Sequence, residues 1–242
     1  MKCEHIRSEW SSNLNKTLEI RQRINILQER IAAACGRAGR PADSVRVIAV
    51  TKTHSAETVQ AVIDAGIADI GENRVQEIRE KAPLLTGTPC LHMIGHLQTN
   101  KVAKAVPLVH WIQSIDSVHL LEKVENACRS AGTKLNVLVQ VNTSGEQSKS
   151  GCAPAEALRL CERAAQSDAV AFQGLMTIGP LGGGERETRN AFITLRNLGE
   201  QCKGLAGKIE LSMGMSGDFE WAIEEGATMV RIGSLLFGER TT

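Results

Sequence analysis

The chain has 242 residues, enough for one large domain with a substantial core or for two small domains. Its 28 lysine and arginine residues balance 27 acidic residues, so no net field favours nucleic acid or an anionic membrane surface. No apolar run reaches the roughly 18 residues of a membrane span, and the N-terminus lacks the apolar core of a secretory signal. The seven cysteines are scattered without a Cys-x-x-Cys pair, which suits a reducing compartment, so we expect a cytoplasmic protein.

Apolar residues at helical spacing predict a leading helix over about residues 14–36, in a helical segment of residues 1–40. Strand-like and helix-like segments then alternate strictly to the end of the chain. The predicted strands are residues 45–51, 68–71, 91–94, 108–115, 135–141, 170–178, 208–212 and 229–232. The predicted helices are residues 56–65, 75–85, 100–105, 118–131, 155–166, 187–203 and 219–225.

This alternation predicts a parallel sheet with right-handed crossovers, and eight strands are the number that closes a TIM barrel. An open, doubly wound sheet is the alternative. Such a sheet would have a glycine-rich turn after its first strand, whereas residues 51–54 (TKTH) contain no glycine. We therefore predict a single α/β domain over residues 1–242, a (β/α)8 barrel with an extra N-terminal helix.

The first predicted strand is an apolar run that stops at a single lysine, Lys52. A lysine at the mouth of a core is partly desolvated, which lowers its pKa and makes the neutral amine available for Schiff-base chemistry. The alternative is a surface lysine that merely follows a strand. The other residues at the carboxyl ends of the strands bear on this choice, because active sites of such barrels lie there.

The loops after the seventh and eighth predicted strands carry the signature of a phosphate pocket. They read Ser212-Met213-Gly214-Met215-Ser216-Gly217-Asp218 and Arg231-Ile232-Gly233-Ser234, and each opens a helix. Glycines allow close approach of the backbone, and serine hydroxyls and free N–H groups donate hydrogen bonds to phosphate. A reactive lysine together with a phosphate pocket suits pyridoxal 5′-phosphate. Sugar-phosphate aldolases need the same pair, so both remain open.

Two further strand-end residues, Asn73 and His96, are candidates for the same site. The histidines lack a metal-binding spacing such as H-E-x-x-H, so we expect no metal. His92 falls inside the third predicted strand and is expected to be a core histidine with satisfied hydrogen bonds.

The chain resembles the pyridoxal phosphate homeostasis protein family. The resemblance covers nearly the whole chain after the leading helix and is specific in combination. The matching segments are residues 49–53 (AVTKT), 71–77 (GENRVQE), 92–101 (HMIGHLQTNK), 148–151 (SKSG), 174–176 (GLM), 212–216 (SMGMS) and 230–234 (VRIGS). Arg74, where many members have tyrosine, and His54-Ser55, in place of a common Lys-Pro, depart from the family pattern.

The resemblance implies a barrel like the N-terminal domain of alanine racemase, with pyridoxal phosphate held as a Schiff base on Lys52. It implies that Ser212, Gly233 and Ser234 hold the phosphate and that Arg231 faces the pyridine nitrogen. With Asn73 and His96 these residues form the expected cofactor-binding set. Family members are regarded as regulators or carriers of the vitamin B6 pool without an established catalytic turnover, so PLP-dependent apoenzymes are the expected recipients.

Racemisation at an amino-acid α-carbon normally uses a base on each face of the cofactor, and racemases of the related fold take the second base from a tyrosine of another domain. This sequence contains no tyrosine, and we expect no second domain. If Arg231 faces the ring nitrogen, its permanent charge disfavours a pyridinium and makes the ring a poorer electron sink. We therefore predict a cofactor-binding protein with no catalytic residue. We expect a monomer, because no obvious apolar patch calls for a dimer. The alternatives are a racemase of low activity that uses Lys52 with His96 or a water, and a cofactor-free Schiff-base aldolase.

Overall fold

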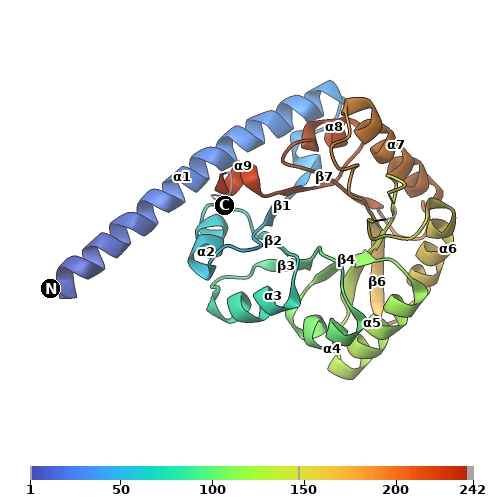
Figure 1. The fold of residues 1–242 in the computed structure, drawn as a ribbon, viewed down its shortest axis with the longest axis horizontal. Helices are drawn as coiled ribbons and strands as arrows, with labels where there is room; N and C mark the ends of the chain where they lie inside the picture. Colours follow the sequence, from blue (N-terminus) through green and yellow to red (C-terminus); the bar gives the residue numbers. More distant parts are fainter. Residues whose placement is uncertain (1, 147, 239–242) are drawn as a thin grey trace.

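The computed structural model describes residues 2–146 and 148–238, with side chains from residue 17 onward. Eight parallel strands form a closed barrel in sequence order, β1 to β8 (Figure 1). This confirms the predicted (β/α)8 barrel and excludes an open sheet. The strands are β1 Arg46–Val50, β2 Asp69–Glu72, β3 Cys90–Met93, β4 Trp111–Ile115, β5 Leu135–Gln140, β6 Val170–Met176, β7 Glu210–Met215 and β8 Met229–Ile232.

Helices alternate with these strands and surround the barrel (Figure 1). They are α2 Ala56–Asp64, α3 Val75–Lys81, α4 Val102–Ala105, α5 Val118–Ala131, α6 Pro154–Ala165, α7 Glu185–Gln201 and α8 Phe219–Glu224, followed by the short α9 Ser234–Phe237. None of the described helices is both long and apolar enough to cross a membrane.

Two predicted elements are shorter in the structure by three residues or more, in each case next to a proline. The strand predicted over residues 108–115 begins only at Trp111, because Pro107 lies in a 3-10 turn, Val106–Leu108. The helix predicted over residues 75–85 ends at Lys81, because Pro83 lies in the 3-10 turn that follows, Ala82–Leu84. Proline has no N–H for a strand ladder or a continuing helix, so both corrections have the same cause.

The N-terminal helix α1, Lys2–Arg37, is longer than predicted and runs along one side of the barrel, with its first residue far from the barrel (Figure 1). Its buried side chains recur at helical spacing and pack toward α2, α8 and α9; they are Ile20, Ile24, Leu27, Ile31, Ala34 and Cys35. Arg30 also forms an ion pair with Glu220 of α8 at 2.8 Å. The residues before Leu14 lack this apolar periodicity, so the start of the helix could not be predicted from it.

Two apolar clusters build the core. The larger one lies between the strands and the surrounding helices. The smaller one comprises Ile48, Trp111, Leu138, Met176 and Met229. Buried polar side chains accompany it, namely His92, Gln113, Ser212 and Arg231, and each is at most 4 % exposed.

Candidate functional site

Four of the predicted site residues lie together at the carboxyl ends of β1 and β8. Lys52, Arg231, Gly233 and Ser234 line one pocket of about 500 Å³, together with Ser216 from the loop after β7. Parallel strands bring their carboxyl ends to one rim of the barrel, which explains why residues so far apart in sequence converge.

Hydrogen bonds anchor the backbone immediately before Lys52. Thr51 is fully buried, and its hydroxyl donates to Glu72 Oε1 at 2.6 Å. Lys81 Nζ donates to the Thr51 carbonyl at 2.9 Å and to Glu72 Oε1 at 2.8 Å. The end of β1 is thus tied to the end of β2 and to α3.

The residue after Lys52 is anchored as well. Thr53 has a φ of 67°, the left-handed conformation that a β-branched residue rarely adopts. Its N–H donates to Glu77 Oε2 at 2.6 Å, and Lys81 Nζ pairs with the same oxygen at 2.8 Å. Thr51 and Thr53, the residues on either side of Lys52, are therefore both held in place by hydrogen bonds to the cluster of Glu72, Glu77 and Lys81.

The two carboxylates of this cluster have opposite pKa shifts. Burial raises the pKa of Glu72, against the hydrogen bonds from Lys81 and Thr51. Glu77 is also partly buried, but hydrogen bonds from Lys81 and the Thr53 N–H outweigh that burial and lower its pKa. Glu77 is therefore the better anionic acceptor for the strained Thr53 backbone.

On the other side of the pocket, Ser216 joins the loop after β7 to the start of α9. Its Oγ accepts the Gly233 N–H at 3.2 Å and the Leu235 N–H at 3.5 Å. The Ser234 hydroxyl makes no hydrogen bond to another described residue. A hydroxyl donor at the pocket wall, beside glycine backbone, suits a phosphate group.

His54 closes the pocket on its β1 side. Its ring stacks on Phe237 of α9, with centroids 4.1 Å apart. Sequence patterns did not indicate this contact, because the two residues are 183 positions apart in the chain. It brings the Lys52 loop and α9 together across the mouth of the pocket.

Arg231 is buried on β8 and is held by neutral acceptors. Its two terminal nitrogens donate to Ser212 Oγ and to the Thr177 carbonyl, each at 2.7 Å. Complete burial lowers the pKa of Arg231 to about 10, against the favourable field of Asp218. The guanidinium is therefore still a cation at neutral pH.

Ser212 lies deeper than the sequence pattern predicted. The strand predicted over residues 208–212 runs on to Met215, with a register shift between Ser212 and Met215, so Ser212 lies inside β7. Its side chain is fully buried, and its hydroxyl donates to Gln113 Oε1 at 2.7 Å. In this structure Ser212 contacts Arg231, while Ser216 lines the pocket that was expected to hold phosphate.

Asn73 and His96 line a second pocket, of about 530 Å³, after β2 and β3. His96 is 55 % exposed, and its Nδ1 lies 3.5 Å from Asp116 Oδ2. Four cations surround this pocket, namely Arg74, Arg79, Lys101 and Lys104. Asn73 and His96 therefore lie in a basic pocket that is separate from the pocket of Lys52.

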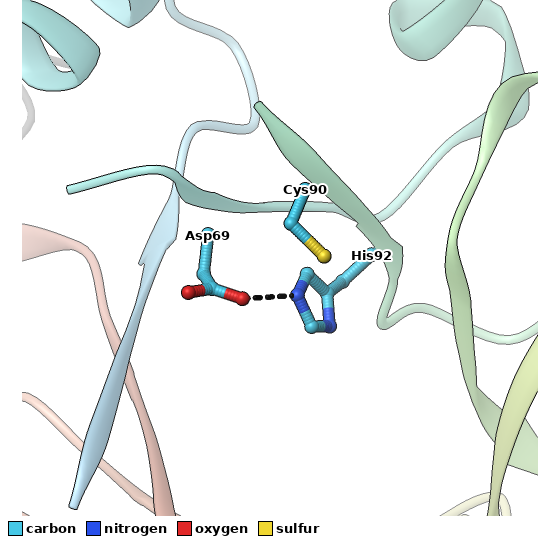
Figure 2. Close-up of side chains that lie close together, drawn as sticks. All are labelled: Asp69, Cys90 and His92. Atoms are coloured by element: carbon cyan, nitrogen blue, oxygen red, sulfur yellow. Dashed lines mark hydrogen bonds and ion pairs between the residues drawn. The ribbon is translucent and has the colours of Figure 1, made fainter. Parts of the chain in front are cut away.

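Among the described residues, Asp69, Cys90 and His92 form the one cluster with metal-ligating atoms close together (Figure 2). His92 Nε2 lies 2.9 Å from Asp69 Oδ1, and its Nδ1 lies 3.0 Å from Gln113 Nε2. His92 is fully buried with both ring nitrogens engaged, which confirms the prediction of a satisfied core histidine.

The comparisons with known proteins agree with this architecture. Residues 24–241 match the family described as alanine racemase, N-terminal domain. The pyridoxal phosphate homeostasis protein of Bos taurus is 42% identical over 96% of this chain and 91% of its own length.

Solved structures point the same way. PipY of Synechococcus elongatus with pyridoxal phosphate bound has a TM-score of 0.75 and 35% identity, over 87% of this chain and 99% of PipY. Alanine racemase of Clostridium difficile has a TM-score of 0.73 over 93% of this chain and 57% of the racemase, at 14% identity, which shows a shared fold.

Proposed function

Because the chain belongs to the alanine racemase N-terminal domain family and, within it, to the pyridoxal phosphate homeostasis proteins, we propose that it holds pyridoxal 5′-phosphate as a Schiff base on Lys52 and buffers or delivers it. One observation supports this above the others: Lys52, Arg231, Gly233 and Ser234 line the same pocket. PipY, a relative of similar length, has been solved with pyridoxal phosphate bound.

The residues of the pocket fit the parts of the cofactor. Lys52 supplies the amine, the Ser234 hydroxyl and the Gly233 backbone suit the phosphate, and Arg231 supplies a cation for the ring nitrogen. The bound cofactor supplies an aldehyde and a conjugated ring that can accept electrons. Ser212 does not line the pocket; it contributes indirectly, because its hydroxyl accepts a hydrogen bond from Arg231. We propose that Asn73 and His96 contribute from the second pocket.

Arg231 favours storage over catalysis. It cannot lose its proton at neutral pH, so it disfavours a protonated ring nitrogen and weakens the ring as an electron sink. The sequence contains no tyrosine to serve as a second base. We therefore propose reversible holding of the cofactor by a monomer, with PLP-dependent apoenzymes as recipients.

The first test is the visible absorption spectrum of the purified protein with and without added pyridoxal phosphate, followed by borohydride reduction and peptide mapping. We expect a yellow protein labelled at Lys52, and no label in Lys52→Ala. Lys208→Ala is the matched control, since Lys208 is 66 % exposed and lies on the loop before β7. A colourless protein that takes up no cofactor would contradict the proposal.

A second measurement separates a carrier from a racemase. The loaded protein is mixed with an apoenzyme that needs pyridoxal phosphate, and separately with L-alanine or L-serine. A carrier activates the apoenzyme and leaves the amino acid unchanged. Formation of the D-amino acid, lost in Lys52→Ala, would establish the racemase instead.

A further inference from the structure

An unbroken line of hydrogen bonds crosses the barrel interior from Asp69 to Arg231. Asp69 Oδ1 lies 2.9 Å from His92 Nε2, and His92 Nδ1 lies 3.0 Å from Gln113 Nε2. Gln113 Oε1 lies 2.7 Å from Ser212 Oγ, which in turn lies 2.7 Å from a terminal nitrogen of Arg231. We call these five residues the trans-barrel network; His92, Gln113 and Ser212 are fully buried.

The chemistry of the donors fixes every proton in this network. Arginine can only donate, so Ser212 Oγ accepts from Arg231 and gives its own proton to Gln113 Oε1. The Gln113 amide nitrogen must then face His92 and donate to Nδ1, and its second hydrogen points toward Met229 Sδ at 3.9 Å. The His92 proton is consequently on Nε2 and is donated to Asp69. Burial also lowers the pKa of His92, which favours this neutral form.

The two ends of the network have different surroundings. Asp69 starts β2 at the amino rim of the barrel, where its side chain is 23 % exposed and lies 3.7 Å from Arg46. Arg231 lines the pocket at the opposite, carboxyl rim. The network therefore connects the solvent-facing amino rim to the pocket that we propose for the cofactor.

Arg231 depends on this network for its position. Among the described residues it forms no ion pair, and its guanidinium is held by Ser212 Oγ and one carbonyl. A hydroxyl can rotate, and only Gln113 Oε1 sets the direction of the Ser212 proton and hence of its accepting lone pair. We propose that Gln113 is the positioning residue for Arg231, and that His92 and Asp69 hold Gln113 in the one amide orientation that does so.

This assignment also predicts that a metal bound by Asp69, Cys90 and His92 would disrupt the network. A metal on His92 Nε2 would need the position of the proton that Asp69 accepts. Moving that proton to Nδ1 would reverse the Gln113 amide and present its NH2 group to Ser212, which already accepts from Arg231. Ser212 would then lack an acceptor for its own proton, at a fully buried position.

The proposal rests on the proposed function for its ligand, so the test has one part that needs no cofactor. Nitrogen NMR of the histidines in the ligand-free protein should show His92 neutral with its proton on Nε2. In Gln113→Glu, which keeps an oxygen for Ser212 but cannot donate, His92 should gain a second proton. A wild-type His92 with its proton on Nδ1 would overturn the proposed network.

The second part measures the affinity for pyridoxal phosphate and for pyridoxal. Gln113→Met removes the hydrogen bonds to His92 and Ser212. It should weaken both ligands about tenfold, to the same extent, because it disturbs the ring end and not the phosphate end. The visible band of the bound cofactor should shift as well. Unchanged affinity and an unchanged band in a folded Gln113→Met would overturn the positioning role.

The last part tests the reach of the network. Asp69→Ala should weaken both ligands about threefold or more, although Asp69 lies at the opposite rim. Asp168→Ala is the matched control, because Asp168 likewise lies near the amino end of a strand, shortly before β6, and pairs with Arg129 at 2.6 Å, outside the network. Equal affinities in the two variants would overturn the role of Asp69. If the wild type bound no cofactor, the proposed function would be wrong. The NMR measurement on the ligand-free protein would still test the hydrogen-bond network.

Discussion

Glu77 Oε2 accepts the backbone N–H of Thr53 at 2.6 Å, and Thr53 has the left-handed φ of 67° next to Lys52. A β-branched residue in this conformation costs on the order of 1–3 kcal/mol and persists only where its surroundings enforce it. Lys81 holds Glu77 in place at 2.8 Å. The strain is therefore located at the residue that directs Lys52 toward the pocket.

Replacing Thr53 with glycine should relieve this strain. Glycine adopts a positive φ without a steric penalty, although it loses more backbone entropy on folding. We expect Thr53→Gly to raise the free energy of unfolding by about 0.5–1 kcal/mol, measured by urea denaturation.

Thr86→Gly is the matched control. The Thr86 N–H also donates to a side chain, Gln60 Oε1 at 2.8 Å, but Thr86 has no positive φ. We expect this variant to lose about 0.5–1 kcal/mol. Equal losses in the two variants would show that the Thr53 conformation stores no strain.

A negative charge at Ser234 should discriminate between the phosphorylated and the free cofactor. Ser234 lines the pocket with Gly233 and Ser216. In Ser234→Asp the added carboxylate repels a phosphate, so we expect the affinity for pyridoxal phosphate to fall roughly a hundredfold more than that for pyridoxal. Fluorescence titration with both ligands measures this ratio.

Ser234→Ala serves as the control, because it removes the hydroxyl without adding charge. It should weaken pyridoxal phosphate only about tenfold. If Ser234→Asp weakened both ligands equally, the phosphate would bind elsewhere.

The barrel and most of the pocket were predictable because local patterns determine them. A buried strand that ends at Lys52 and serine-glycine loops after the last two strands are visible as short segments, and the barrel topology brings them to one rim. The barrel is the confirmed part of the prediction. The binding roles of the residues at its rim stay a prediction, although strand order alone implies that they lie close together.

The hydrogen bonds of the barrel interior could not be predicted in the same way. The apolar pattern predicts that a strand ends at Ser212, whereas β7 continues through a register shift to Met215 and leaves Ser212 inside the barrel. Gln113 could not be predicted as part of a site, because one glutamine in an apolar run gives no sign of its partners. Its contacts to His92 and Ser212 depend on strand stagger, which hydrophobic periodicity does not report.

Gly95 joins two of the segments that carry the family resemblance, residues 71–77 and 92–101, by close backbone contact. A Cβ at this position would lie 2.4 Å from the Asn73 carbonyl oxygen, and backbone cannot move aside cheaply. We expect Gly95→Ala to destabilise the fold by about 1–3 kcal/mol and to displace Asn73. Gly207→Ala, with no neighbour within 4 Å, should change stability by less than about 0.5 kcal/mol. Thermal unfolding of both variants measures the difference, and equal melting temperatures would contradict the close contact.

The Glu125–Arg163 pair should make part of the stability depend on pH. Glu125 of α5 is 3 % exposed and accepts two hydrogen bonds from Arg163 of α6, each at 2.8 Å. The hydrogen bonds from Arg163 lower the pKa of Glu125 below its ordinary value of 4.5, against a smaller effect of burial. A carboxyl group with a depressed pKa in the folded state contributes stability above its unfolded pKa and loses it as the pH falls through the folded pKa.

Glu125→Gln should therefore cost about 1–2 kcal/mol at pH 7, a value limited by solvent screening because the Arg163 side chain is 36 % exposed. The cost should shrink as the pH falls below 4.5, where the wild-type carboxyl also becomes neutral. Urea unfolding at pH 7 and in steps below pH 4.5 measures the difference between the two proteins. Asp168→Asn at the exposed pair with Arg129 should show no measurable change at any of these pH values, because water screens that pair. If the difference in the free energy of unfolding between wild type and Glu125→Gln did not change with pH, the charge of Glu125 would not contribute to its pairing with Arg163.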